Sequence, residues 1–173
     1  MREPDATWVI PSEDEWYKAA YHKNDGVTGN YWDYLTSTNA VPSNDLIDPD
    51  PGNNANFYQS GYTIGSPYYR TEVGDFANSD SPYGTFDQGG NVWEWNEAVL
   101  FGSYRGLRGG SFISNDINLL AAYRNISSRT DSIPTFESYN VGFRVSAVPE
   151  PTSLALLALG GVGMLFRRRG LGR

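Results

Sequence analysis

The amino-acid sequence predicts an α+β fold: one loop-rich domain with short strands and little helix. Composition is the first indication, because 19 Gly, 10 Pro and 14% aromatic residues among 173 describe tight turns packed by large rings. Within residues 1–147, only residues 12–24 carry the signals of a helix, and strand-like alternation is confined to short runs. The length suits one domain with its own core, followed by a distinct C-terminal segment.

A short helix is expected to begin after Ser12. Ser12 is a favourable N-cap, and Glu15 three residues later completes a capping box. The spacing predicts a core-facing stripe of Trp16, Ala19 and Ala20 and a solvent-facing side of Glu13, Lys18 and Lys23. The helix should end near His22–Asn24, before Gly26, which makes the only histidine a helix-end residue rather than a metal ligand.

Residues 25–87 are expected to form ordered loops and short strands, because they are rich in Asn, Asp, Gly, Pro, Ser and Tyr and have no sustained periodicity. Their aromatic residues are too frequent for a disordered linker, so these rings should pack the loops on the core: Tyr31, Trp32, Tyr34, Phe57, Tyr58, Tyr62, Tyr68 and Tyr69. Asp45, Asp48 and Asp50 do not fit an EF-hand, since prolines interrupt them and no glutamate follows at the required distance. We expect a solvated turn there.

The run Gly90-Asn91-Val92-Trp93-Glu94-Trp95, preceded by Asp87, leaves two interpretations open. It could be an edge strand, with Val92, Glu94 and Asn96 on one face and both tryptophans on the core face. It could also be a structural cation site, because a carboxylate among buried rings needs a cation, a metal ion or several donors. Three arginines could pair with these carboxylates or be ordinary surface residues: Arg108, Arg124 and Arg144.

Two further runs indicate strands and close turns. The paired glycines of Arg108-Gly109-Gly110-Ser111-Phe112 predict a tight turn or a close backbone approach. Tyr139-Asn140-Val141-Gly142-Phe143-Arg144-Val145 alternates as a closing strand would.

Charge and cysteine content exclude several functions. Residues 1–150 hold all 20 acidic side chains but only 9 of the 13 Lys and Arg, so this part would repel the phosphates of nucleic acid. The chain has no cysteine, which excludes disulfides, thiolate metal sites and a cysteine nucleophile. Its first residues have no apolar stretch of signal-peptide length, so no signal peptide is visible.

The C-terminal segment is unlike the rest. Pro149-Glu150-Pro151 is followed by the uncharged apolar residues 152–166 and then by Arg167, Arg168 and Arg169. As a helix, the apolar stretch would span roughly 22 Å, which is shorter than the ~30 Å hydrocarbon core unless arginines snorkel and the bilayer thins. We expect a hydrophobic membrane helix with a cytoplasmic C-terminal end, rather than a buried helix of the domain.

This arrangement resembles the PEP-CTERM sorting signal of Gram-negative bacteria, in which a Pro-Glu-Pro motif precedes a hydrophobic segment and terminal arginines. The resemblance covers residues 148–173 and separates them from a domain at residues 1–147. It implies an exosortase-type processing enzyme as partner and delivery to the cell envelope, membrane-anchored or released outside. Such proteins normally begin with a signal peptide, so we expect a truncated chain.

Four ordered motifs carry a second resemblance: Pro11-Ser12-Glu13-Asp14-Glu15-Trp16, the Trp run, Arg108-Gly109-Gly110-Ser111-Phe112 and Gly142-Phe143-Arg144. They are similar to the signatures of the sulfatase-modifying-factor family, which includes the formylglycine-generating enzyme. The resemblance implies an elaborated C-type-lectin-like α+β fold. Family members usually carry an opening strand before the helix, and we expect that portion to be missing here.

The resemblance also bears on catalysis. The family's enzymes oxidise a cysteine of a sulfatase to formylglycine with two copper-binding cysteines, whose positions align with Ser114 and Leu119. A hydroxyl is too basic to replace a soft Cu(I) ligand and leucine cannot ligate, so we expect no copper, no catalytic residues and no enzyme activity. A cysteine-independent oxidoreductase, or a truncated fragment with no independent function, is the alternative.

Calcium is the cofactor that the resemblance does imply. Transferred residue by residue, one family site comprises the Asp87 side chain, the Gly90 and Val92 carbonyls and the Glu94 carboxylate. This all-oxygen set suits a hard cation. The expected function is therefore a non-catalytic, envelope-targeted, C-type-lectin-like binding or scaffold module for a protein or glycan ligand.

Overall fold

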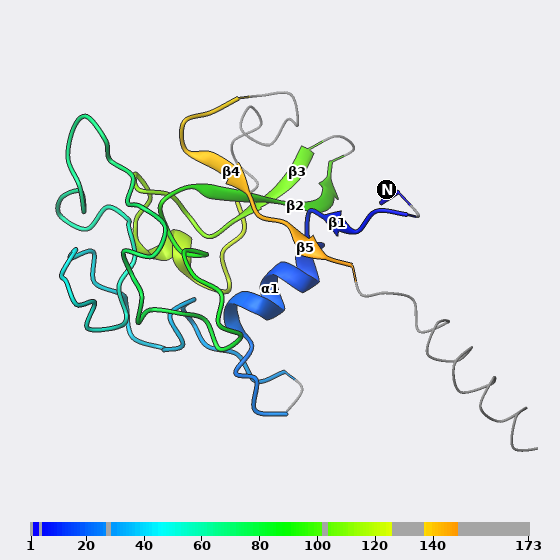
Figure 1. Cartoon of the computed structure of the whole chain (residues 1–173), viewed down its shortest axis with the longest axis horizontal. Coiled ribbons are helices and arrows are strands. Elements are labelled where there is room, and N and C mark those ends of the chain that lie inside the picture. Colours follow the sequence, from blue (N-terminus) through cyan, green and yellow to red (C-terminus); the bar gives the residue numbers. More distant parts are fainter. Residues whose placement is uncertain (1, 4, 27–28, 102–103, 126–136, 149–173) are drawn as a thin grey trace, which may run out of the picture. The chain divides into compact units, whose positions relative to one another are not determined.

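A three-stranded sheet contains the tryptophan-rich run. The computed structural model describes residues 2–3, 5–26, 29–101, 104–125 and 137–148. Strand β2 (Trp93–Leu100) lies between β3 (Tyr104–Arg108), which is antiparallel to it, and β4 (Val141–Phe143), which is parallel (Figure 1). The edge-strand interpretation is thus wrong, because β2 is the central strand. Glu94 and Asn96 are as buried as Trp93, so neither face of β2 is open to solvent at this point.

Helix α1 (Glu13–Tyr21) has the predicted boundaries. The Ser12 side chain accepts a hydrogen bond from the Glu15 N–H, and the Glu15 carboxylate accepts one from the Ser12 N–H, which is a complete capping box. His22 is the C-cap, as expected. A single 3₁₀ turn, η1 (Asp116–Leu119), is the other helical element among the described residues. The described residues are therefore loop-rich with little helix.

A two-stranded sheet forms outside residues 10–145. The described residues divide into two compact units, one within residues 10–145 and one formed by described residues of 2–9 and 146–148. In the second unit, β1 (Trp8–Val9) pairs antiparallel with β5 (Ser146–Ala147). The prediction that the family's opening strand is missing stays a prediction, and ahead of α1 the described residues form the two-residue β1. Pairing with residues far along the chain makes this strand, and such pairing leaves no local signal in sequence.

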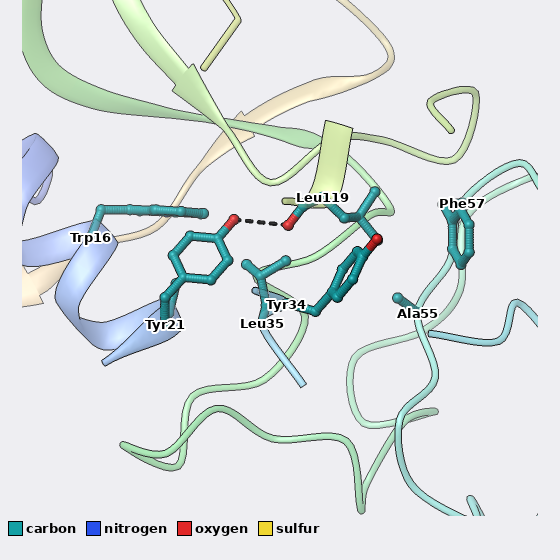
Figure 2. Close-up of a cluster of buried hydrophobic side chains, with 8 residues drawn as sticks. Trp16, Tyr21, Tyr34, Leu35, Ala55, Phe57 and Leu119 are labelled. Atoms are coloured by element: carbon teal, nitrogen blue, oxygen red, sulfur yellow. Dashed lines mark hydrogen bonds between the residues drawn. The ribbon is translucent and has the colours of Figure 1, made fainter. Parts of the chain in front are cut away.

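The hydrophobic core joins α1 to the loops. Its buried residues are Trp16, Ala20, Tyr21, Tyr34, Leu35, Ala55, Phe57 and Leu119. Figure 2 shows the Tyr21 ring between α1 and the turn at Leu119, whose carbonyl accepts a 3.0 Å hydrogen bond from the Tyr21 hydroxyl. Burial raises the pKa of Tyr21, so this hydroxyl stays protonated and donates. The expected packing of loop rings on the core is confirmed for Tyr34 and Phe57.

The predicted solvated turn at Asp50 is wrong. Asp50 is buried, whereas Asp45 and Asp48 are exposed. Its carboxylate accepts bonds of 2.6–3.0 Å from the Gly52 and Asn78 N–H groups, the Asn54 amide and the Ser79 hydroxyl. Burial by itself raises the pKa of Asp50, but these four donors together lower it below its usual range. The carboxylate therefore ties the loop at residues 50–54 to residues 78–79.

Substituting Asp50 tests that role. Because its folded-state pKa is lowered, Asp50 contributes stability that is present above the unfolded pKa of about 3.9 and is lost as the pH falls through the folded value. We expect Asp50→Asn to lower the free energy of unfolding by about 2 kcal/mol at pH 7 and to flatten its decline below about pH 4. Urea titrations at several pH values measure both effects. The exposed Asp45→Asn is the control, and equal pH profiles for the two variants would contradict the assignment.

Candidate functional site

The buried carboxylate of Glu94 on β2 has a cationic partner, which is the partly exposed guanidinium of Arg144. Arg144 Nε lies 2.5 Å from Glu94 Oε2, and Arg144 Nη2 lies 2.5 Å from Oε1. Trp16 Nε1 of α1 donates a further 2.7 Å hydrogen bond to Oε2. The register explains the pairing, because Glu94 lies beside Gly142 of β4 and Arg144 follows Gly142 on the same face. Of the partners left open by the sequence, Arg144 is the one that Glu94 contacts.

Glu13 forms a second ion-pair network, contrary to the prediction that it faces solvent. Its Oε1 lies 2.6 Å from Arg108 Nε and 3.0 Å from Arg124 Nη2, and its Oε2 accepts a bond from the Asn96 amide. Arg108 also donates to the Ala121 and Tyr123 carbonyls. The surface interpretation is therefore wrong for Arg108, which is buried and joins α1, β3 and the segment at residues 121–124.

The four residues of the predicted calcium site lie before and within β2. Asp87 Oδ2 is buried and has no hydrogen-bond partner. Burial raises the pKa of Asp87, although the Gly74 N–H and Arg144 act in the opposite direction. Glu94 Oε1 accepts one bond and Oε2 accepts two, so Oε1 is the more available ligand atom. Gly90 has a φ of 75°, and Val92 is half-buried.

An unpartnered buried carboxylate oxygen fits a cation site, since such an atom is costly without one. Among the described residues no group of three or more His, Cys, Asp or Glu side chains could hold a metal ion. A site with two carboxylates would complete its coordination with backbone carbonyls, as the prediction requires. The residues are thus compatible with calcium at Asp87, and calcium stays a prediction.

The positions aligned with the copper-binding cysteines have structural contacts. Leu119 is fully buried in the hydrophobic core. Ser114 Oγ accepts a 3.0 Å hydrogen bond from the Ser111 N–H and lies 3.1 Å from Ser111 Oγ. The Ser114 carbonyl accepts a bond from the Tyr58 N–H. The Ser114 side chain therefore supports the turn after Gly110, and the Leu119 side chain packs in the core.

An aromatic pocket lies next to this turn. It has a volume of about 400 Å³ and is lined by Tyr62, Pro67, Tyr68, Tyr69, Arg70, Phe112, Ile113 and Tyr139. We call this set the tyrosine pocket. Its rings contact one another: Tyr69 stacks on Phe112 at 5.5 Å, and Tyr62 meets Tyr69 edge-on at 5.0 Å. Arg70 Nη1 donates a 2.6 Å hydrogen bond to the Tyr139 carbonyl.

We did not predict the tyrosine pocket from the sequence. Tyr62, Tyr68 and Tyr69 were expected to pack on the core, but Tyr68 is 74% exposed and Tyr62 is 45% exposed. The signal that could have indicated a surface site is the residue type, since tyrosine tolerates exposure better than phenylalanine and often lines binding surfaces. No periodicity brings residues 62–70, 112–113 and 139 together.

Residues 3–148 match the model of the sulfatase-modifying factor enzyme 1-like domain. The chain belongs to this domain family. Residues 147–169 of this family member match the PEP-CTERM protein-sorting motif, which implies delivery to the cell envelope and processing by an exosortase-type enzyme. The motif residues Pro149–Pro151 and Arg167–Arg169, with the expected membrane helix, lie outside the described residues. Within the described ranges, no helix is both long and apolar enough to cross a membrane.

Two solved structures are among those similar to this sulfatase-modifying-factor domain. "Treponema denticola variable protein 1" is 22% identical, with a TM-score of 0.42, over 82% of this chain and 48% of the other. A second structure, titled "Crystal Structure of CarF", is 19% identical. It has a TM-score of 0.45 over 85% of this chain and 50% of the other. The chain thus spans about half the length of these structures. No curated protein matches it.

Proposed function

We propose that this sulfatase-modifying-factor domain is a non-catalytic binding module displayed at the cell envelope, with the tyrosine pocket as its ligand site. The sorting motif supports the location. The pocket is the observation that carries the binding role, because concave sites lined by aromatic rings with a few polar groups are typical of ligand binding. Two of its lining residues, Phe112 and Ile113, belong to the turn that ends at Ser114.

The non-catalytic part of the proposal is supported by the chemistry of two positions. Ser114 and Leu119 stand where the resemblance places the copper-binding cysteines of the family's enzymes, and the chain has no thiol at any position. Both side chains are buried and engaged in the fold. Copper-dependent oxygen consumption with a cysteine-containing peptide would contradict this part of the proposal.

The C-terminal segment, residues 148–173, supports the proposed display at the cell envelope. An exosortase-type enzyme would act near Pro149–Pro151, and the apolar residues that follow would hold the chain in the membrane until processing. The arginines at the end would keep that terminus on the cytoplasmic side.

Binding through the tyrosine pocket is tested with the full chain in mild detergent. The protein is immobilised and exposed to purified envelope polysaccharides, purified envelope proteins and a displayed peptide library. We expect one of these classes to bind, and Tyr68→Ala to weaken binding by about tenfold because Tyr68 is the most exposed ring of the pocket. Failure of all three classes to bind a correctly folded protein would overturn the proposed function.

We also propose that calcium binds at Asp87, with the Gly90 and Val92 carbonyls and Glu94 Oε1 as the other ligands. Millimolar calcium is expected to raise the melting temperature of the wild-type chain, because an ion that binds only the folded state stabilises it by mass action. Differential scanning calorimetry with calcium or EDTA measures the shift.

Asp87→Asn distinguishes stabilisation by calcium from the effect of the Asp87 side chain on folding. The variant should lose the calcium-dependent shift, and without calcium it should be at least as stable as the wild type, since an amide in this buried position carries no charge. An unchanged melting curve of the wild type in EDTA and in calcium would show that the site is not occupied.

A further inference from the structure

Four rings of the tyrosine pocket pack on one another and so restrain each other without a ligand: Tyr62, Tyr69, Phe112 and Tyr139. Phe112 packs between Tyr69, at 5.5 Å, and Tyr139, at 6.0 Å, and Tyr62 contacts both Tyr69 and Phe112. Phe112 itself is buried, so it anchors these exposed or half-exposed tyrosines to the domain. A rigid set of rings loses little conformational entropy when a ligand binds.

Polar groups surround these ring faces. Four tyrosines contribute hydroxyl groups, each of which can donate and accept a hydrogen bond. The guanidinium of Arg70 carries five N–H donors, and its bond to the Tyr139 carbonyl uses one and orients the group at the pocket wall. The pocket therefore combines flat apolar faces with hydroxyl and N–H groups at short intervals.

We propose that the tyrosine pocket binds an uncharged carbohydrate, with the C–H face of a pyranose ring stacked on the exposed tyrosine rings. This inference rests on the proposed function and names the ligand class of the same site. A pyranose has one apolar face and a rim of hydroxyls, which matches rings bordered by tyrosine hydroxyls and Arg70. The volume of about 400 Å³ lies at the small end of ligand pockets and suits a short stretch of saccharide.

The lining residues are less suited to a peptide. All of them lie in loops and turns, so no strand edge is available for pairing with an extended peptide. Only Pro67 and Ile113 offer aliphatic surface for an apolar side chain. An anionic polymer is also disfavoured, because the chain carries a net charge of −7.

Calorimetric titration of the full chain in mild detergent with uncharged oligosaccharides tests the proposal. The probes are the hexamers of β-1,4-glucose, α-1,4-glucose and β-1,4-N-acetylglucosamine. We expect at least one of them to bind, Tyr68→Ala to weaken its binding by about tenfold, and Tyr68→Phe to retain most of it because the ring face is kept. Trp8→Ala is the control, since Trp8 is 63% exposed but does not line the pocket.

The outcomes separate the ligand class from the binding function. If no hexamer binds but a library peptide binds and Tyr68→Ala abolishes that binding, the carbohydrate proposal is overturned and the binding module stands. If a hexamer binds equally well to the wild type, Tyr68→Ala and Arg70→Gln, the assignment to this pocket is overturned. If no hexamer, envelope polysaccharide, envelope protein or library peptide binds to protein whose thermal unfolding is normal, both proposals fail.

Discussion

Arg144→Gln is expected to lower the free energy of unfolding by about 3 kcal/mol, because it leaves the Glu94 carboxylate buried without its cation. The Glu94 side chain is 7% exposed, and only the Trp16 bond would remain of the three that it accepts. Arg144 itself is 26% exposed, which places the loss at the lower end of the range for broken buried ion pairs. Urea denaturation followed by circular dichroism measures the change.

Two further variants make the interpretation specific. Glu94→Gln combined with Arg144→Gln removes both charges, so the double variant should lose less stability than the two single variants added together. Arg70→Gln removes an exposed arginine with one bond to a backbone carbonyl and should cost well under about 1 kcal/mol. A loss for Arg144→Gln no larger than for Arg70→Gln would mean that Glu94 does not depend on the guanidinium.

Gly90→Ala should be the more damaging of the two substitutions, with an expected loss of about 4 kcal/mol or failure to fold. A Cβ atom at residue 90 would lie 2.1 Å from the Asn56 carbonyl oxygen and 2.7 Å from its carbon. These are backbone atoms, held by a 2.7 Å hydrogen bond from the Asn91 N–H to the same oxygen. Relief would require the loop at Asn56 to leave the start of β2. Soluble yield and thermal unfolding report the effect.

Gly84→Ala isolates the steric part of that loss. Gly84 has a φ of 69°, close to the 75° of Gly90, but a Cβ atom there would meet nothing within 4 Å. The control therefore carries only the cost of a left-handed backbone, about 1–2 kcal/mol. Similar losses for both variants would show that the approach of Asn56 is not what requires glycine at position 90.

The start of the capped helix could be predicted to the residue, and its end to within a few residues, because these signals are local. Ser12 and Glu15 bond to each other's backbone across three residues, and the stripe around Trp16 follows from helical spacing alone. What that reasoning missed on the same helix was Glu13, whose partners Arg108 and Arg124 are more than ninety residues away. Helical spacing cannot distinguish a solvated carboxylate from one that faces a distant arginine.

At the candidate site, the tryptophan run likewise indicated some features from local sequence and left others to tertiary contacts. Its composition indicated that Glu94 needs a positive partner, because burial of an unpaired charge is unfavourable whatever the fold. It could not indicate which partner, or that β2 is central, since both depend on the parallel register with β4. Asp50 was misjudged for a related reason, as two of its four donors come from residues 78–79.

By itself, the sequence determined the family, the loop-rich α+β class, the sorting motif and the approximate boundaries of α1. Each of these depends on short runs of contiguous residues. Only the tertiary structure decided that Glu94 pairs with Arg144, that Glu13 joins two arginines, and that rings from residues 62–70, 112–113 and 139 form one pocket. The physical reason is that these contacts join segments separated by tens of residues. Their geometry is set by strand register and loop packing, which no local periodicity encodes.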